Sequence, residues 1–277
     1  LRQSPPSTSN LPYEKIEGKV PYLRLRAFDA DHVDKLEEFA RSSVSLRKSP
    51  VIILDLRGNR GGSDNYVTDW FQNLSSQSFR DFRIKALKSE VSLQGLVNRA
   101  RCSLQAPDLT LEARRLFETW ERDGVAELEQ EARSRGTAFR EWESRQAIVE
   151  GKAPEAFSGR LIVLMDAGCA SACESALMLA RQVPGTLFLG ENSRGGAVFG
   201  DVLNYQLPSS LIRITLGYKW FQAPDDALKE GHGYPPDFWI DSEEPEAVAK
   251  QLADCLLRRT CTIPAKLKAA SADSHGA

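Results

Sequence analysis

An α/β fold is predicted by two segments of this chain in which a strand ends in a short loop and a helix follows. The first strand, 51–56, runs into a loop that is rich in glycine. The second strand, 161–165, runs into small residues and then into a helix at 171–181. Strands that alternate with helices form parallel sheets, and the loops at the strand ends are where α/β enzymes place their chemistry.

The remaining elements follow in order along the chain. After a polar lead-in at 1–17, residues 21–28 alternate apolar and basic side chains, a pattern typical of a half-exposed strand. A helix from about residue 31 then precedes strand 51–56, and this strand-helix-strand order implies parallel strands. Residues 87–150 are dense in Glu, Arg, Leu and Ala, which predicts a helical insertion. The other expected elements are helices at 66–74 and 245–257 and strands at 186–189, 202–207 and 211–217.

The composition is that of a soluble globular protein. The 277 residues are 42% hydrophobic and 27% charged, enough for a sizeable core. The formal net charge of -2 gives no reason to expect a nucleic acid or an anionic membrane as a partner. The most apolar stretch, 161–180, contains Asp166 and Glu174, so we expect no membrane span. The first residues lack the charged and apolar pattern of a secretory signal peptide.

The cysteines are few for a chain of this length, so a disulfide framework is not required. Because their number, five, is odd, at least one thiol stays unpaired within the monomer. Cys255 and Cys261 bracket a helix end and could form a disulfide in an oxidising compartment. Cys169 and Cys173 are expected to be small buried packing residues. No His or second Cys-x-x-Cys accompanies them, so we expect no metal site.

A serine at the start of the second helix is the candidate nucleophile. At a helix N-terminus the developing alkoxide of Ser171 faces the positive end of the helix dipole, and the Ala172 N–H can join an oxyanion hole. Backbone N–H groups of Gly61 and Gly62 are candidates for its other half. The alternative is structural, because Ser171 and Glu174 have the spacing of a capping box. A second candidate nucleophile, Ser175, lies one helical turn further on.

The order of four motifs resembles that of a known protease family. The motifs are D-L-R-x-N-x-G-G at 55–62, G-x-A-S-A-x-E at 168–174, Gly190-Glu191, and G-Y-P-P-D at 233–237. Together they resemble the tail-specific (C-terminal-processing) serine proteases and the catalytic core of tricorn protease. The resemblance implies a mixed sheet flanked by helices of the ClpP/crotonase type. It also implies a serine endopeptidase that needs no metal or cofactor, acts on unfolded polypeptides or C-terminal tails, and is extracytoplasmic (periplasmic or secreted).

This resemblance divides the chain and assigns roles within it. The first part of the peptidase core is 18–86 and the second is 151–262, separated by the insertion 87–150 and followed by a flexible tail, 263–277. The family's core has a much shorter connection at the insertion, which is therefore a candidate lid or partner surface, or else a solvated helical hairpin. The resemblance makes Ser171 the nucleophile and places a backbone N–H of the glycine pair opposite it. Arg57 and Asn59 are expected to hold the glycine loop by hydrogen bonds.

The general base is the part of the family's machinery that this sequence does not supply in the usual place. Tail-specific proteases use a lysine where this chain has Gly196, so the Ser-Lys dyad is absent. Arg194 cannot replace it, because a guanidinium stays protonated at any working pH. The tricorn-like branch instead uses a histidine from a segment N-terminal to the core and a glutamate, here matched by Glu230. Within the chain, His232 is the histidine nearest a motif and the candidate base, and the others are His32 and His275. We interpret the base as residing in a segment upstream of this chain.

Two other functions remain open at this stage. The interphotoreceptor retinoid-binding proteins use this fold to carry apolar ligands without proteolysis, and a missing lysine fits a catalytically degenerate binding module for an apolar ligand or peptide. A CoA-thioester enzyme of the crotonase type is a further alternative, which Ser171 and the loop 59–62 disfavour. The sequence carries no indication of oligomeric state or of cleavage specificity.

Overall fold

The chain folds into two compact units, described here from a computed structural model. Unit 1 comprises Leu1–Asp81, Ile148–Ala197 and Ala223–Ala277, and unit 2 comprises Phe82–Ala147 and Val198–Gln222. The structure describes residues 11–29, 32–107, 109–133, 140–143, 147–207, 209–240, 242–258 and 267–269.

Unit 1 is built on a seven-stranded sheet with the order β1-β2-β3-β8-β9-β12-β13. The strands from β2 to β12 pair in parallel, whereas β1 and β13 pair antiparallel at the two edges. The mixed sheet expected from the resemblance is therefore confirmed. The strand bounds are Tyr13–Ile16 (β1), Tyr22–Leu25 (β2), Val51–Asp55 (β3), Arg160–Met165 (β8), Leu187–Gly190 (β9), Phe238–Ile240 (β12) and Leu267–Ala269 (β13).

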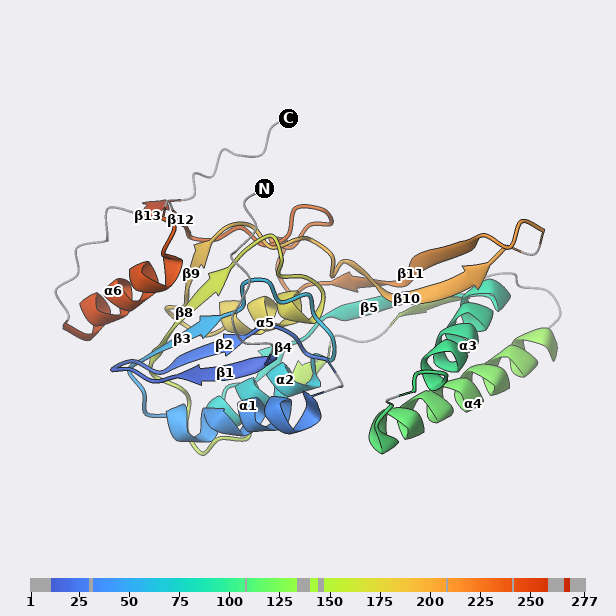
Figure 1. Ribbon diagram of the computed structural model, residues 1–277, viewed down its shortest axis with the longest axis horizontal. Helices are drawn as coiled ribbons and strands as arrows, with labels where there is room; N and C mark the ends of the chain where they lie inside the picture. The colour runs from blue at the N-terminus through green and yellow to red at the C-terminus, as the bar shows by residue number, and fades with distance from the viewer. Residues whose placement is uncertain are drawn as a thin grey trace. The chain divides into compact units, whose positions relative to one another are not determined.

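Helices cover both faces of this sheet, as Figure 1 shows. On one face α6 packs over β3 and β8, and its Leu252 and Ala253 join Ile53 and Ile162 in a buried cluster. Helices α1, α2 and α5 lie on the other face, where Phe39 and Trp70 are fully buried. The apolar side chains of β3 are thus buried on both sides, which explains its continuous apolar sequence. The helix bounds are Val33–Leu46 (α1), Asn65–Leu74 (α2), Ala172–Arg181 (α5) and Pro245–Arg258 (α6).

The loops after β3 and β8 emerge side by side at one edge of the sheet. The two strands are parallel neighbours, and their register pairs Asp55 with Leu164. Both strands therefore end at the same level, and the residues that follow them meet. This edge is where ligands and catalytic groups collect in open parallel sheets. A short pair of strands, Phe79–Arg80 (β4) and Ile148–Val149 (β7), completes unit 1.

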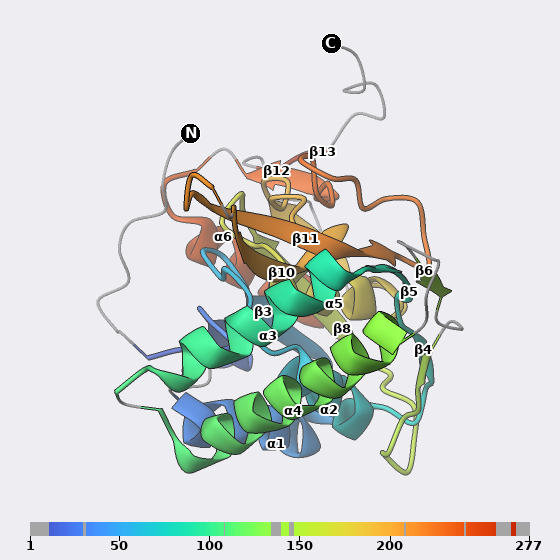
Figure 2. The same ribbon diagram turned by 90° about the vertical axis from the view of Figure 1, so that its right-hand side faces the viewer.

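Unit 2 combines a four-stranded antiparallel sheet with a helical hairpin. The sheet order is β10-β11-β5-β6, with bounds Phe199–Gln206 (β10), Arg213–Gln222 (β11), Arg83–Lys88 (β5) and Arg140–Glu143 (β6). Helices α3 (Glu90–Leu104) and α4 (Leu111–Arg133) lie side by side, as Figure 2 shows. They approach closely where Gly124 meets Val97, and α3 packs on β10 where Gly95 meets Leu203.

The structure corrects three expectations from the sequence. Strand β1, Tyr13–Ile16, lies within the stretch expected to be a polar lead-in, and β13, Leu267–Ala269, lies within the stretch expected to be a flexible tail. Both are edge strands, too short to give an alternating pattern of their own. The strands expected at 202–207 and 211–217, β10 and β11, belong to unit 2, where β10 pairs with β11 and β11 pairs with β5. Within the described residues, no helix is both long and apolar enough to cross a membrane.

Candidate active site

Ser171 lies at the apex of a sharp turn between β8 and α5, the elbow (residues 166–173). Its backbone has φ 56 and ψ -122, a conformation that non-glycine residues rarely adopt. The side chain is exposed, and the Glu174 N–H donates to the Ser171 backbone oxygen at 2.7 Å. Serine nucleophiles in α/β enzymes sit on strained strand-to-helix turns of this kind, which present the hydroxyl outward. By contrast, the Ser175 side chain is buried and donates its hydroxyl to the Asp64 carboxylate at 3.2 Å.

The glycine loop (residues 57–62) comes into direct contact with the elbow. A Cβ on Gly61 would lie 2.8 Å from both the Ala170 oxygen and the Ser171 Cβ, and 3.0 Å from the Ala172 nitrogen. Gly62 has φ +130, and a Cβ there would lie 2.3 Å from the Phe28 oxygen. Glycine is therefore required at both positions because the backbones approach too closely for any side chain.

Two backbone N–H groups next to Ser171 are left without acceptors among the residues that the structure describes: those of Gly62 and Ala172. The Gly61 N–H is used differently, since it donates to Asn59 Oδ1 at 2.9 Å. Of the glycine pair, Gly62 is thus the member whose N–H is available to an oxyanion. Two such donors on facing loops are the arrangement that stabilises a tetrahedral intermediate in acyl transfer.

Asn59 joins the glycine loop to both of its neighbours, as expected from the sequence. Its side chain donates to the Leu25 oxygen at 3.1 Å while accepting from the Gly61 N–H. Its backbone oxygen accepts from the Ala170 N–H at 3.0 Å, which ties the glycine loop to the elbow. The Asp166 carboxylate adds a second link, because it accepts from the Gly58 N–H at 2.8 Å.

A buried ion pair anchors the start of the glycine loop. Arg57 donates to both oxygens of the fully buried Asp55 carboxylate, from Nε at 2.8 Å and from Nη2 at 2.7 Å. Arg26 lies 3.3 Å from the same carboxylate and also donates to the Arg57 backbone oxygen. Burial alone raises the pKa of Asp55, but the hydrogen bonds and charge of Arg57, with the charge of Arg26, outweigh it and hold that pKa below its usual value.

Glu174 links the elbow to a second loop, residues 193–196. Its fully buried carboxylate accepts from Ser193 Oγ at 2.6 Å and from the N–H groups of Gly195 and Gly196 at 2.7 and 2.8 Å. It also accepts from the Ser171 N–H at 3.3 Å, which is the carboxylate half of the expected capping box. Burial raises the pKa of Glu174, and the hydrogen bonds offset only part of that increase.

The 193–196 loop in turn holds the loop at 229–234. Ser193 exchanges hydrogen bonds with Tyr234, and the Gly231 N–H donates to the Gly195 oxygen at 2.8 Å. A Cβ on Gly195 would lie within 2.6 Å of three backbone nitrogens of the 229–234 loop, so glycine is required there. Gly196, expected from the sequence at the position of the family's lysine, is different: a Cβ there would meet only the Ala170 Cβ, at 3.8 Å.

Glu230 and His232 lie on this 229–234 loop, and both are exposed. The His232 Nδ1 lies 3.1 Å from the Glu230 backbone oxygen, so the ring is positioned by the Glu230 main chain. If that nitrogen carries the proton, Nε2 is free to accept one. Among the described residues, no hydrogen bond joins the His232 ring to Ser171. His32 precedes α1 and donates its N–H to the Asp29 oxygen, and His275 lies outside the described residues.

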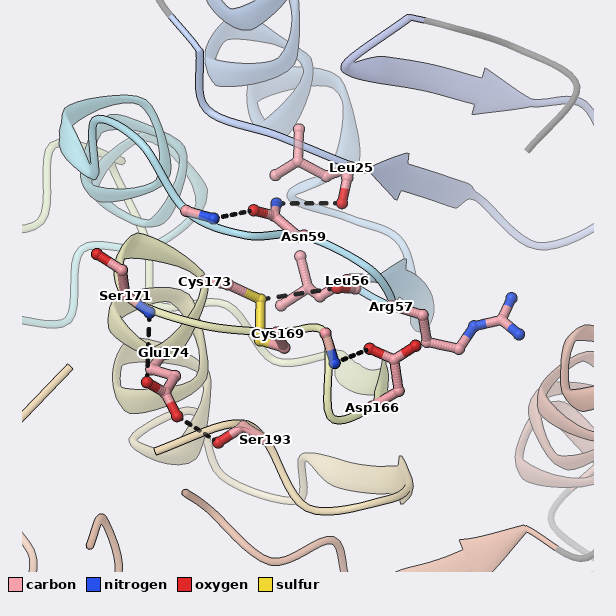
Figure 3. The surroundings of a disulfide bond; sticks show 12 residues. Leu25, Leu56, Arg57, Asn59, Asp166, Cys169, Ser171, Cys173, Glu174 and Ser193 are labelled. Atoms are coloured by element: carbon pink, nitrogen blue, oxygen red, sulfur yellow. Dashed lines mark hydrogen bonds between the residues drawn. A yellow bond between two sulfur atoms is a disulfide. The ribbon is translucent and has the colours of Figure 1, made fainter. Parts of the chain in front are cut away.

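The cysteines around Ser171 form a disulfide, which corrects the expectation that they only fill space. Cys169 and Cys173 are fully buried, as expected, but their sulfur atoms are bonded and their Cα atoms lie 5.4 Å apart. Figure 3 shows this bond beneath the elbow. Cys255 is also disulfide-bonded, and Cys261 lies outside the described residues. Cys102 on α3 is free and exposed.

Sequence reasoning proposed Ser171 as nucleophile and the Gly62 and Ala172 N–H groups as donors, but it missed two anchors of the elbow. The role of Glu174 as a link to the 193–196 loop depends on a contact across 19 residues, which no local pattern reveals. The disulfide was detectable in principle, because cysteines four residues apart at a helix start bring their Cα atoms within bonding range. No group of three or more His, Cys, Asp or Glu side chains within the described ranges is arranged to hold a metal ion.

Comparison with known proteins assigns the chain to a family. Residues 19–240 match the model of Peptidase family S41. The structure of mature CPAF is similar, with 17% sequence identity and a TM-score of 0.57 over 90% of this chain and 53% of that chain. CPAF complexed with lactacystin matches at 18% identity and a TM-score of 0.57, over 87% of this chain and 52% of that chain.

The photosystem II D1 C-terminal processing protease is also similar, with 16% identity and a TM-score of 0.46 over 83% of this chain and 46% of that chain. This chain thus spans about half the length of these solved structures. Among curated proteins, none is similar enough to count as a relative. Since the family model covers most of the sequence, the chain belongs to Peptidase family S41.

Proposed function

We propose that this member of Peptidase family S41 is a serine endopeptidase of the tail-specific type in which Ser171 is the nucleophile. The observation that carries the proposal is the strained backbone of an exposed Ser171 on an elbow that contacts the glycine loop, where the Gly62 and Ala172 N–H groups have no acceptor among the described residues. A serine that served only as a helix cap would use its hydroxyl to satisfy the helix start. Here the Glu174 N–H donates to the Ser171 backbone oxygen at 2.7 Å, and the Ser171 backbone is held in an unfavourable conformation.

In this mechanism Ser171 Oγ attacks the carbonyl carbon of a peptide bond while a base removes the hydroxyl proton. The carbonyl oxygen becomes negatively charged and accepts hydrogen bonds from the Gly62 and Ala172 N–H groups. The base then gives its proton to the leaving amine, and an acyl-enzyme remains on Ser171. Water, deprotonated by the same base, hydrolyses the ester and regenerates the serine. None of these steps requires a metal or a cofactor.

The base in this proposal is a histidine oriented by Glu230, supplied by a segment upstream of residues 1–277. The 229–234 loop reaches the elbow through the 193–196 loop and Glu174, so Glu230 belongs to the same network of loops as Ser171. His232 is the alternative base within the chain, because its ring is positioned by the Glu230 carbonyl. Gly196 has no side chain, so the lysine mechanism of the family is not open to this protein.

The substrate of such a site is a polypeptide in an extended or unfolded segment, including C-terminal tails. A cavity of about 430 Å³ in unit 1 is lined mostly by polar or charged side chains, and such side chains make up half of the lining of another of about 640 Å³, which does not favour a carrier of apolar ligands. The disulfides at Cys169–Cys173 and Cys255 support an oxidising, extracytoplasmic location.

Cleavage of an unfolded protein by three forms of the enzyme tests the proposal. The forms are the chain itself, the chain with its natural upstream sequence, and that longer form with Ser171→Ala. We expect cleavage by the longer form, loss of cleavage in Ser171→Ala, and little or no cleavage by the chain alone. Cleavage by the chain alone, lost in His232→Ala, would move the base to His232. Absence of cleavage by every form would favour a binding module.

A further inference from the structure

The Cys169–Cys173 disulfide closes the elbow directly beneath Ser171. It joins the residues two positions before and two positions after the serine, with their Cα atoms 5.4 Å apart. Both cysteines are fully buried while Ser171 is exposed, and Figure 3 shows the serine side chain directed away from the sulfur atoms. The bond therefore joins the two ends of the elbow on its buried side, and Ser171 lies between them on the exposed side.

Apart from the hydrogen bond that the Cys173 N–H donates to the Ala170 oxygen at 3.1 Å, the two ends of the elbow are held by separate parts of the fold. Before Ser171, the Ala170 N–H donates to the Asn59 oxygen at 3.0 Å and the Cys169 oxygen accepts from the Arg194 N–H at 2.8 Å. After Ser171, Cys173 belongs to the first turn of α5. The disulfide is the covalent link that fixes one end against the other. A residue in a sparsely populated backbone conformation persists only where its surroundings over-determine it.

The shortness of the bridge indicates a local rather than a global role. A disulfide stabilises the folded state largely by restricting the unfolded chain, and this contribution grows with the length of the loop that it closes. Cys169 and Cys173 are only four positions apart, so the bridge restricts the unfolded chain little. Because the bridge flanks the strained Ser171, it is placed to restrain the backbone of that residue.

We propose that the Cys169–Cys173 disulfide is a positioning element for the nucleophile, which keeps Ser171 in its strained conformation beside the glycine loop. This inference rests on the proposed function of Ser171. It also predicts that the enzyme is sensitive to reduction. A dithiol reductant would transfer two electrons and two protons to the bridge, giving the Cys169 and Cys173 thiols, and would itself become a cyclic disulfide. The elbow would then relax, and Ser171 would lose its alignment.

Substitution is a cleaner test than reduction, because a reductant also reaches the disulfide at Cys255. We would compare the wild-type chain with its natural upstream sequence, the double variant Cys169→Ala/Cys173→Ala, and Cys102→Ala as the matched control. Three quantities would be measured: the rate at which a fluorophosphonate probe labels Ser171, the amide hydrogen exchange of a peptide spanning 166–175, and the melting temperature. Peptide mapping without reductant would first establish the Cys169–Cys173 bond.

We expect the double variant to be labelled about tenfold more slowly. A rate change of this size corresponds to the lower end of the strain energy of a residue held in a sparsely populated backbone conformation. Its elbow should exchange faster while its melting temperature changes little, and Cys102→Ala should match the wild type. Unchanged labelling and exchange in the double variant would overturn the proposal, as would free thiols in the mapped wild type. If the wild type is not labelled at all, the proposed function fails separately. The exchange measurement then decides the role of the disulfide by itself.

Discussion

The glycine loop and the elbow leave neighbouring parallel strands, yet they are held by different kinds of bonds. The glycine loop is anchored by the buried ion pair between Asp55 and Arg57. The elbow is anchored by the Cys169–Cys173 disulfide and by Glu174, whose four hydrogen-bond donors are all uncharged. The comparison shows that the two loops of one site depend on different interactions and are disrupted by different changes. Protonation of Asp55 weakens the first support, whereas reduction of the disulfide weakens the second.

The largest effect on folding should come from Asp55→Asn. This change leaves the Arg57 guanidinium buried beside a neutral amide, and removal of one member of a buried ion pair costs about 3–5 kcal/mol. Denaturant unfolding of the variant would measure the loss. Glu246→Gln is the matched control: its carboxylate also contacts Arg57, at 3.1 Å, but is 38% exposed. A loss as large in the control as in Asp55→Asn would contradict a dominant role for Asp55.

Gly61→Ala tests the contact between the two regions. The new methyl group would lie 2.8 Å from the Ala170 oxygen and the Ser171 Cβ at a residue with φ +98, which should cost about 2–4 kcal/mol and slow labelling of Ser171. Gly58→Ala provides the comparison, because Gly58 also has a positive φ but no atom within 4 Å of the added Cβ. We expect only about 1–2 kcal/mol there and normal labelling. Equal effects on labelling would mean that the loops do not need this close approach.

Glu174→Gln separates the elbow from the 193–196 loop with little change in shape. Each carboxylate oxygen accepts from two donors, and an amide nitrogen that replaces one oxygen would face N–H or O–H groups instead. Leaving buried donors unsatisfied should cost about 2–3 kcal/mol. We also expect slower labelling of Ser171, measured below the unfolding temperature of the variant. Full labelling in Glu174→Gln would restrict Glu174 to capping the helix.

Ser171→Gly should remove backbone strain. Glycine adopts positive φ readily, so this variant should be roughly 0.5–1 kcal/mol more stable than Ser171→Ala, after the larger entropy of the unfolded glycine chain is taken into account. Both variants lack the hydroxyl, so the difference between their unfolding free energies reports the backbone alone. A glycine variant that is less stable than the alanine variant would argue against strain at this position.

The pH dependence of stability should have opposite signs in the two regions. The pKa of Asp55 is lowered by folding, so its stabilisation is present above its ordinary value of 3.8 and is lost as pH falls through the folded pKa. The pKa of Glu174 is raised, so its contribution is present below 4.5 and is lost as pH rises through its folded pKa. As pH rises through the folded pKa of Glu174, the unfolding free energy of the wild type should therefore fall relative to that of Glu174→Gln. Parallel curves would contradict the raised pKa.

Local sequence patterns predicted the parts of the fold whose structure is decided locally. The apolar run at β3, the small residues before α5 and the amphipathic helices each have a pattern that a short window contains. The edge strands β1 and β13 were not predicted. Tyr13–Ile16 and Leu267–Ala269 are too short for a pattern, and they form strands by pairing with their neighbours. The placement of β10 and β11 in unit 2 was also not predicted, because it depends on the pairing of β11 with β5, more than a hundred residues away in the sequence.

The candidate site divides in the same way. Ser171, Gly62 and Ala172 lie in motifs of a few residues and could be proposed from the sequence. The use of the Gly61 N–H by Asn59 and the contacts of Glu174 with the 193–196 loop depend on how the loops meet. The base remained unassigned because no local pattern around His232 places its ring near Ser171.

Identification of the serine that reacts with a fluorophosphonate probe tests the central claim most directly. The protein with its natural upstream sequence would be labelled, digested and mapped by mass spectrometry, with Ser171→Ala treated in parallel. The structure predicts a single adduct on the peptide that contains Ser171, absent from Ser171→Ala. An adduct on Ser175, or on any serine that persists in Ser171→Ala, would contradict the assignment of Ser171 as the nucleophile.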